Sequence, residues 1–328
     1  MSPPAPASGS YVVLSGGSGG VKLAVGLAQL LRERLAVVVN TGDDFTHLGL
    51  HISPDVDTVL YSLAGVVNEE TGWGRSGESW TFMHALGALG GPTWFKLGDG
   101  DLATHIDRTS RMHAGETLTG VGARQAAALG VAARILPMTD DAVRTAVETD
   151  LGLLTFQEYF VRDQCRPVVR SVRFDGAGAA RPTPQVIEAL SARDLAGILI
   201  GPSNPWLSVD PILAVPGMRE AMKTSGAPIV AVSPIIGGKA VKGPTAKIMA
   251  ELGLQPDSRA VARHYGGLID GFVIDSQDEA LEKDMGLPIL ATNTLMRTLD
   301  DKIALSRQCL AFCDRLAGKR RAGREASS

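Results

Sequence analysis

Short apolar runs alternate along the chain with longer stretches of helical spacing. The first run, residues 11–15, ends at glycines, and the stretch that follows, residues 21–34, places leucines three and four positions apart. A second apolar run covers residues 35–39. A strand, a glycine loop, a helix and a second strand in this order are typical of the first unit of a parallel sheet.

Five further apolar runs predict strands at residues 133–136, 196–200, 229–233, 271–274 and 289–292. Helical patterns separate or follow them at residues 184–192, 216–224, 245–252, 277–285 and 299–317. This alternation predicts an α/β fold, a doubly wound, mostly parallel and Rossmann-like sheet.

Two regions depart from this alternation. Helical patterns dominate residues 53–125, where we expect a helical cap. Residues 141–175 predict an antiparallel hairpin insertion, with arms at 143–149 and 154–161, a turn between them, and a candidate third strand at 168–174. We therefore expect one α/β domain over residues 11–318, between a disordered leader at 1–10 and a disordered basic tail at 319–328.

Composition and charge exclude several classes of protein. Apolar residues make up 45% and charged residues 20% of the chain, which excludes whole-chain disorder. A net charge of −3 is unsuited to a protein whose main partner is nucleic acid or an anionic membrane. Four prolines break the longest weakly charged stretch, 196–218, so it is no membrane span. The absence of a signal peptide pattern and only three cysteines predict a cytoplasmic location.

The loop after the first predicted strand is rich in glycine. Glycines let the backbone approach a ligand closely, and the helix that follows aims free N–H groups at it, so the loop predicts a phosphate site. It lacks the lysine of a P-loop and the spacing of the dinucleotide fingerprint. The alternative is a tight strand-to-helix turn. The candidate phosphate-binding residues are Gly16, Gly17, Ser18, Gly19 and Gly20.

Four acidic residues follow the second predicted strand. Asp43 and Asp44 stand at its carboxyl end, where α/β sheets bind ligands, and Asp55 and Asp57 fall in the first turn of the next predicted helix. Carboxylates beside a phosphate loop are typical Mg²⁺ ligands, so we expect some subset of the four to hold Mg²⁺. Residues two apart face different ways on a helix, so at most one of Asp55 and Asp57 meets the earlier pair. The alternative role for these two is to stabilise the helix dipole.

Two later loops also follow predicted strands. Ser203 and Asn204 come after the fourth strand, and Lys239 and Lys242 come after the fifth. Lysines on glycine-flanked loops suit a polyanionic ligand, although exposed lysines often have no ligand. Because the carboxyl ends of parallel strands share one edge of the sheet, we expect all these loops to form one cleft.

Asp101 and His105 stand four residues apart and share one face of a predicted helix. No second histidine or cysteine lies at zinc-ligand spacing. We interpret the segment as a helix start that lines a pocket.

Together these segments resemble the 2-phospho-L-lactate transferase family, which acts in the biosynthesis of the deazaflavin coenzyme F-420. The resemblance covers residues 11–312 and lies in segments 15–20, 40–44, 53–61, 96–105, 201–205 and 233–239. A related family, nucleotide-sugar-binding regulators of gluconeogenesis, shares the glycine loop and the Asp-Asp pair but resembles segments 53–61 and 96–105 less. Ser18 and Lys22 depart from the family pattern at the phosphate loop.

The resemblance implies a specific reaction. A phospho-acid moiety (phospholactyl, enolpyruvyl phosphate or phosphoglyceryl) passes from a guanosine-diphosphate-activated donor to the ribityl hydroxyl of the deazaflavin Fo, and GMP leaves. It implies Mg²⁺ as cofactor, Asp44 as the group that orients or deprotonates the hydroxyl, and a small-molecule donor and acceptor as partners. Trp80, Phe82 and Trp94 are candidates for stacking on the deazaflavin, or else belong to the core of the cap.

Two alternatives remain open at this point: a non-catalytic nucleotide-sugar-binding regulator, and a dinucleotide-dependent oxidoreductase. The acid pair together with the downstream acids Asp55 and Asp57 favours the enzyme over the regulator, because a regulator needs the loop but no metal site. The donor acids differ by one small group, which no motif distinguishes. A homodimer is expected from the prevalence of dimers among soluble proteins.

Overall fold

The computed structural model of the chain describes residues 9–325, and the expected leader and tail lie partly outside this range. Its centre is a seven-stranded sheet in the order β14-β13-β10-β9-β1-β2-β5, in which every pairing is parallel. The strands are β1 (Ser10–Ser15), β2 (Leu35–Val39), β5 (Arg134–Pro137), β9 (Leu195–Ile200), β10 (Ile229–Val232), β13 (Gly271–Asp275) and β14 (Ile289–Thr292).

These seven strands coincide with the seven apolar runs of the sequence, so the predicted fold class is confirmed. The chain leaves β1 toward β2 and β5 on one side, and later returns to build β9, β10, β13 and β14 on the other. The order therefore reverses between β1 and β9, which is the position where open α/β sheets bind ligands.

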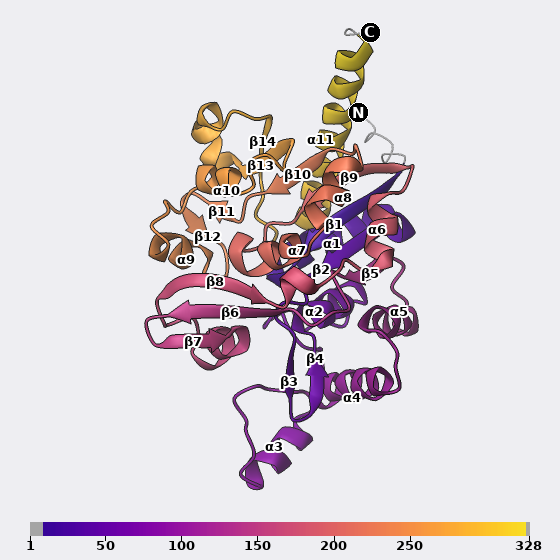
Figure 1. Cartoon of the computed structure of the whole chain (residues 1–328), viewed down its shortest axis with the longest axis vertical. Coiled ribbons are helices and arrows are strands. Elements are labelled where there is room, and N and C mark those ends of the chain that lie inside the picture. Colours follow the sequence, from indigo (N-terminus) through magenta and orange to yellow (C-terminus); the bar gives the residue numbers. More distant parts are fainter. Residues whose placement is uncertain (1–8, 326–328) are drawn as a thin grey trace.

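Helices cover both faces of the sheet (Figure 1). The helices that pack on one face are α1 (Gly17–Leu31), α2 (Pro54–Leu63), α5 (Leu118–Ala128) and α11 (Leu299–Glu325). The other face carries α6 (Pro184–Leu190), α7 (Asp210–Ala214), α8 (Met218–Thr224), α9 (Thr245–Glu251) and α10 (Ser258–His264). Alternate strand residues such as Val12 and Val13 point into opposite cores, as the period of a buried strand requires.

The cap is smaller than the expected range 53–125, because α2 and α5 belong to the layer on the sheet. The part that extends beyond the sheet consists of α3 (Thr81–Ala88), α4 (Asp99–His113) and a hairpin of β3 (Phe45–His47) and β4 (Leu50–Ile52) (Figure 1). The sequence analysis missed this hairpin, because each strand has three residues and is too short to show an alternating pattern.

A second sheet, in the order β7-β6-β8, forms the antiparallel insertion. Its strands are β6 (Arg144–Thr149), β7 (Gly152–Thr155) and β8 (Val169–Asp175). The prediction of a strand over 154–161 was wrong: β7 ends at Thr155 and a π-helical turn covers Glu158–Arg162. Glu158 accepts hydrogen bonds from the backbone N–H and the hydroxyl of Thr155, and Tyr159 is fully buried, so local capping and core packing favour the turn.

Both ends of the chain differ slightly from the sequence prediction. Ser10 already belongs to β1, and α11 continues through Glu325 into the region expected to be a disordered tail. Residues 277–285, predicted as a helix, form 3-10 turns over Ser276–Asp284. Among residues 9–325, no helix has the length and apolar character needed to cross a bilayer.

Candidate active site

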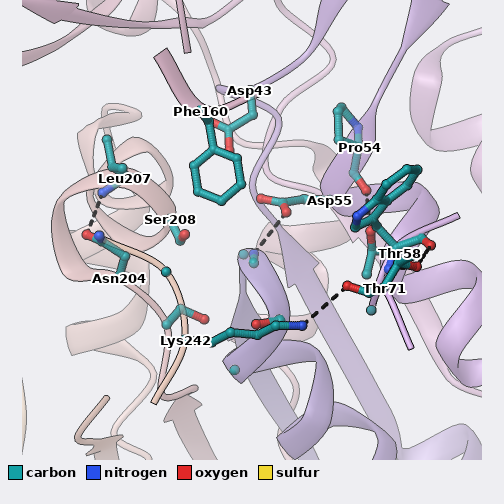
Figure 2. Close-up of a pocket in the computed structure, with 18 of the residues that line it drawn as sticks. Asp43, Pro54, Asp55, Thr58, Thr71, Phe160, Asn204, Leu207, Ser208 and Lys242 are labelled. Atoms are coloured by element: carbon teal, nitrogen blue, oxygen red, sulfur yellow. Dashed lines mark hydrogen bonds between the residues drawn. The ribbon is translucent and has the colours of Figure 1, made fainter. Parts of the chain in front are cut away.

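A cleft with a volume of about 680 Å³ opens at the carboxyl edge of the sheet. The loops that follow β1, β2, β9 and β10 all contribute to its wall. Figure 2 shows Asp43, Asp55, Phe160 and Asn204, which come from four separate segments, around this space. The structure therefore gathers the loops at the point where the strand order reverses.

The glycine loop forms one side of the cleft, where Gly16, Gly17, Ser18 and Gly19 line it. Gly17 has a φ of 62°, a left-handed conformation that glycine adopts without strain, and α1 starts there. A Cβ on Gly19 would stand 1.9 Å from the carbonyl oxygen of Pro202, so the loops after β1 and β9 approach too closely for any side chain at this position.

Gly20 lies behind the cleft, and its N–H donates to the Ser203 hydroxyl at 3.0 Å. This bond fixes the loop after β1 to the loop after β9. Ser203 itself lines the cleft, so the two loops form one continuous wall.

Asn204 caps the helical turn that follows it. Its Oδ1 accepts hydrogen bonds from the N–H groups of Trp206 and Leu207, at 3.0 and 3.1 Å. Its Nδ2 is buried and has no hydrogen-bond partner within the described part of the chain, although Asn204 lines the cleft. An unpartnered buried donor in a cleft wall is suited to a ligand oxygen.

Asp55 ties three segments together. Its two oxygens accept hydrogen bonds from the Gly17 N–H at 2.9 Å and from Asn40 Nδ2 at 3.0 Å. Asn40 in turn accepts from the N–H of Gly42 at 2.7 Å. Burial raises the pKa of Asp55 to about 6, although these hydrogen bonds act in the opposite direction.

Asp43 is 4% exposed and lines the cleft beside Asp55. Its Oδ1 is buried and has no hydrogen-bond partner among residues 9–325. Burial, together with the charge of Asp55, raises the pKa of Asp43 well above its usual range. The side-chain amide of Gln157 donates to the Asp43 backbone carbonyl at 3.1 Å and fixes this stretch of chain.

Asp44 and Asp57 are both occupied by protein partners. Asp44 does not line the cleft; it accepts a hydrogen bond from Ser53 Oγ at 2.7 Å and lies 3.1 Å from His51 Nε2. Asp57 lines the cleft, but both its oxygens contact the guanidinium of Arg108, which is fully buried. The four candidate acids therefore occupy different environments, and Asp43 alone among them keeps a buried oxygen without a partner.

Asp43 and Asp55 fit the requirements of Mg²⁺. The described residues contain no group of three or more acidic, histidine or cysteine side chains arranged as a metal site. Mg²⁺ is usually bound through one or two carboxylates together with substrate phosphates and water. Asp43 has an oxygen without a partner in the described chain, and each oxygen of the neighbouring Asp55 accepts a single neutral hydrogen bond and keeps a further lone pair, whereas Asp57 is paired with a cation.

The three predicted aromatic residues lie at different places. Trp94 lines the cleft and contacts His47 and Phe95 edge-on. Trp80 lines a small neighbouring pocket, and Phe82 packs against the core of the cap. Only Trp94 of the three belongs to the main cleft.

Aromatic residues that the sequence analysis did not single out also line the cleft, namely Tyr61, Trp73, Phe95, Phe156 and Phe160. Phe156 and Phe160 stack with ring centroids 5.2 Å apart. Their i, i+4 spacing was a helical signal that the partial alternation of residues 154–161 concealed.

Three lysines line the cleft, namely Lys22, Lys96 and Lys242. Lys242 Nζ donates to the Thr71 carbonyl at 3.3 Å, and Lys22 Nζ donates to the Met296 carbonyl at 3.1 Å. Burial and the charge of Lys242 lower the pKa of Lys22. Lys239 is exposed in β12 (Lys239–Ala240) and does not line the cleft.

The family model described as 2-phospho-L-lactate transferase CofD matches residues 11–299. The chain belongs to this family. The match covers the whole sheet and all four loops of the cleft.

Relatives in the 2-phospho-L-lactate transferase CofD family carry two different names. The chain is 42% identical over 313 residues to a phosphoenolpyruvate transferase of Streptomyces griseus, covering 92% of this chain and 98% of the relative. It is 38% identical over 309 residues to a 2-phospho-L-lactate transferase of Methanocaldococcus jannaschii, covering 93% and 98%.

A solved structure confirms the fold of this family member. A protein of the upf0052 family from Bacillus halodurans superimposes with a TM-score of 0.60 at 17% identity, covering 93% of this chain and 99% of that chain. At this identity the likeness concerns the fold alone.

Proposed function

We propose that the protein transfers a phospho-acid moiety from a guanosine-diphosphate-activated donor to the ribityl hydroxyl of the deazaflavin Fo and releases GMP. The terminal hydroxyl oxygen forms a bond to the phosphorus that carries the small acid, and the bond from that phosphorus to GMP breaks. The product is a phosphodiester. The observation that carries the proposal is the convergence of the glycine loop, Asn204 and Asp43 on one cleft in a member of this family.

The donor would lie along the glycine loop. Backbone N–H groups at the start of a helix favour phosphate oxygens, and Asn204 Nδ2, which has no partner in the described chain, adds a donor from the adjoining loop. Lys242 is held at the rim by a backbone carbonyl rather than by an acid, so its charge is available to a polyanion.

The aromatic side chains would receive the deazaflavin. Trp73, Trp94 and Phe160 line the cleft and are each more than a third exposed, which leaves their faces accessible to a planar ring. In this proposal a flat acceptor would lie beside the phosphorylated donor in the same cleft.

Asp43 and Asp55 would hold Mg²⁺. When bound there, the ion would neutralise phosphate charge and stabilise the leaving nucleotide. Transfer at phosphorus depends mainly on positioning and charge neutralisation, so it requires little covalent chemistry from the protein.

Asp44, which we expected to orient or deprotonate the acceptor hydroxyl, is held behind the cleft by Ser53 and His51. Ser53 directly precedes α2, the helix that carries Asp55. We therefore assign Asp44 a positioning role in this proposal: it fixes the start of α2 and thereby the carboxylate of Asp55.

Product analysis by mass spectrometry tests the proposal. The protein would be incubated with Mg²⁺, Fo and, in separate reactions, the guanylylated forms of phospholactate, phosphoenolpyruvate and phosphoglycerate. All three donors are needed because relatives with both names are about equally similar to this chain. We expect GMP and a deazaflavin phosphodiester from at least one donor. Formation of neither product from any donor would refute the proposal.

A further inference from the structure

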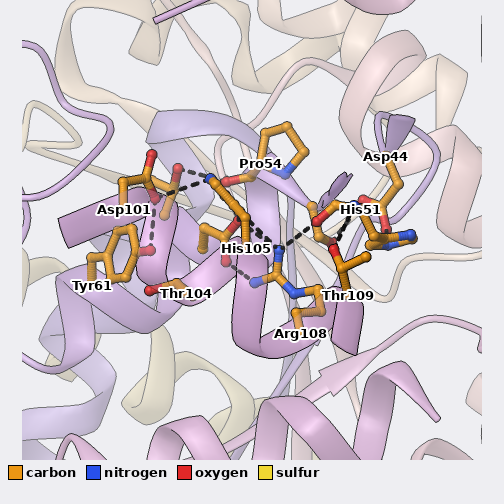
Figure 3. Close-up of polar contacts among 12 residues, drawn as sticks. Asp44, His51, Pro54, Tyr61, Asp101, Thr104, His105, Arg108 and Thr109 are labelled. Carbon is orange, nitrogen blue, oxygen red and sulfur yellow. Dashed lines mark hydrogen bonds and ion pairs between the residues drawn. The ribbon is translucent and has the colours of Figure 1, made fainter. Parts of the chain in front are cut away.

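The segment that contains Asp101 and His105 has no role in the donor or metal site described above. Both side chains line the cleft, yet Asp101 is 8% exposed and His105 is 2% exposed. They lie on α4, on the same helical face as Arg108, opposite Tyr61 of α2 (Figure 3). Asp57 of α2 pairs with Arg108. This buried polar cluster forms part of the cleft wall.

The chemistry of Arg108 determines the direction of the hydrogen bonds in this cluster. Its Nη1 contacts Asp57 Oδ2 at 3.0 Å and His105 Nδ1 at 3.4 Å. A guanidinium only donates, so Nδ1 accepts and the ring proton of His105 sits on Nε2. Nε2–H is buried, has no aligned hydrogen-bond partner within the described chain, and lies 3.2 Å from Asp101 Oδ1.

Asp101 uses only one oxygen within the protein. Oδ1 accepts the hydroxyl of Tyr61 at 2.7 Å and faces His105, whereas Oδ2 has no protein donor among residues 9–325. Burial alone would raise the pKa of Asp101, but His105, Tyr61 and Arg108 outweigh it and hold the pKa below its usual range. The group is therefore an ionised hydrogen-bond acceptor in the cleft wall rather than a base.

The cleft wall therefore carries an acceptor, Asp101 Oδ2, beside a donor, His105 Nε2–H. A hydroxyl group is the ligand that can satisfy both at once, because it donates one hydrogen bond and accepts others. Trp73 and Trp94, which line the same cleft, supply aromatic surface, whereas phosphate would be repelled by the Asp101 carboxylate.

We propose that Asp101 and His105 bind a hydroxyl group on the polyol chain of the acceptor, with Asp101 Oδ2 accepting from the hydroxyl and His105 Nε2–H donating to it. This inference rests on the proposed function and extends it to the acceptor subsite. Arg108 and Asp57 act behind this pair as positioning residues, because Arg108 donates to Nδ1 of His105 and Asp57 holds Arg108 in place.

Binding of Fo, followed by its deazaflavin fluorescence, tests this inference without requiring turnover. In Asp101→Asn we expect Fo affinity to fall about 10- to 100-fold, the range for one hydrogen bond to a charged group, while GDP affinity is unchanged. His105→Gln, which retains an N–H near the Nε2 position, should lower Fo affinity less than His105→Leu does. Asp107→Asn on the solvent side of α4 is the matched control, and each variant's thermal midpoint verifies folding.

Acceptors that lack single polyol hydroxyls identify the bound group. The wild-type protein should discriminate against one deoxy acceptor, and Asp101→Asn should lose that discrimination. If Asp101→Asn keeps wild-type Fo affinity, or lowers the affinity for GDP instead, the inference is wrong while the proposed function stands. If the wild-type protein binds GDP but no Fo, both fail.

Discussion

Asp43 and Asp44 are neighbours in sequence with opposite environments. Asp43 presents a partnerless oxygen to the cleft, whereas Asp44 is held by Ser53 and His51 on the other side of the chain. Sequence could identify the acidic pair but not which member faces the ligand, because the turn after β2 decides the direction of each side chain. Likewise, the sequence could not show that Asp57 pairs with Arg108, because the two residues are 51 positions apart.

The pair gives a first prediction. Asp43→Asn should lower kcat/KM by more than about 100-fold. Mutation of a residue that only orients a metal ligand typically lowers activity about 10- to 100-fold, and loss of a direct ligand should lower it further. Asp44→Asn should lower kcat/KM only about 10-fold, because it weakens the contacts to Ser53 and His51 but removes no side chain from the cleft. Steady-state kinetics with both variants measure this, and a larger loss in Asp44→Asn would reverse the assignment.

A second prediction concerns pH and Mg²⁺. The folded pKa of Asp55 is about 6, above its ordinary value of 3.8, so the folded protein without metal holds a proton that the unfolded chain releases. This contribution to stability is present at low pH and is lost as pH rises through about 6. Mg²⁺ competes with that proton for the carboxylate, so the stabilisation by Mg²⁺ should grow as pH rises through the same range.

Thermal unfolding with and without millimolar Mg²⁺ measures this at about pH 5 and about pH 7.5. We expect a rise in Tm with Mg²⁺ at the higher pH and little at the lower one. The rise should be absent in Asp43→Asn. An equal rise at both pH values would contradict the assignment of Asp43 and Asp55 as ligands.

Among the secondary-structure elements, the long buried ones were predictable and the short polar ones were not. All seven strands of the parallel sheet are apolar runs between polar loops, which is a direct signal of strands buried on both faces. The π-helical turn at Glu158–Arg162 was missed because Tyr159 owes its burial to packing against the insertion and the main core, which local alternation does not record.

A third prediction tests the contact between the loop after β1 and the loop after β9. Gly19→Ala places a methyl group against the backbone of Pro202, which cannot move without displacing Ser203. We expect a loss of roughly 1–3 kcal/mol in stability, typical of overpacking, and weaker GDP binding. Urea unfolding and calorimetric titration measure the two effects. Gly318→Ala, at an open position of α11 without a positive φ and outside the cleft, is the control for glycine loss, and wild-type GDP affinity in Gly19→Ala would contradict the prediction.

A fourth prediction concerns the ion pair between α2 and α4. Arg108→Gln leaves Asp57 as a buried carboxylate without its cation, which typically costs about 3–5 kcal/mol. Urea unfolding should show this loss, whereas Arg111→Gln on the solvent side of α4 should change the midpoint little. Equal effects from both substitutions would mean that the buried pair does not hold the two helices together.

For the whole molecule, the parallel order of the strands explains why distant loops meet. Residues near positions 17, 43, 204 and 242 come together because each follows a strand at the same sheet edge. This convergence was predictable from sequence, whereas the wall formed by the cap and the insertion was not, because tertiary packing places it. The expected homodimer stays a prediction, which sedimentation would check.

The most direct test of the central claim is a crystal structure of the protein with GDP, Mg²⁺ and Fo. The account predicts the diphosphate at Gly17–Gly19 and Asn204, the metal between Asp43, Asp55 and phosphate oxygens, and the deazaflavin between the aromatic walls with its polyol chain at Asp101. A nucleotide bound elsewhere, or an Fo site that does not share this cleft with GDP, would contradict it.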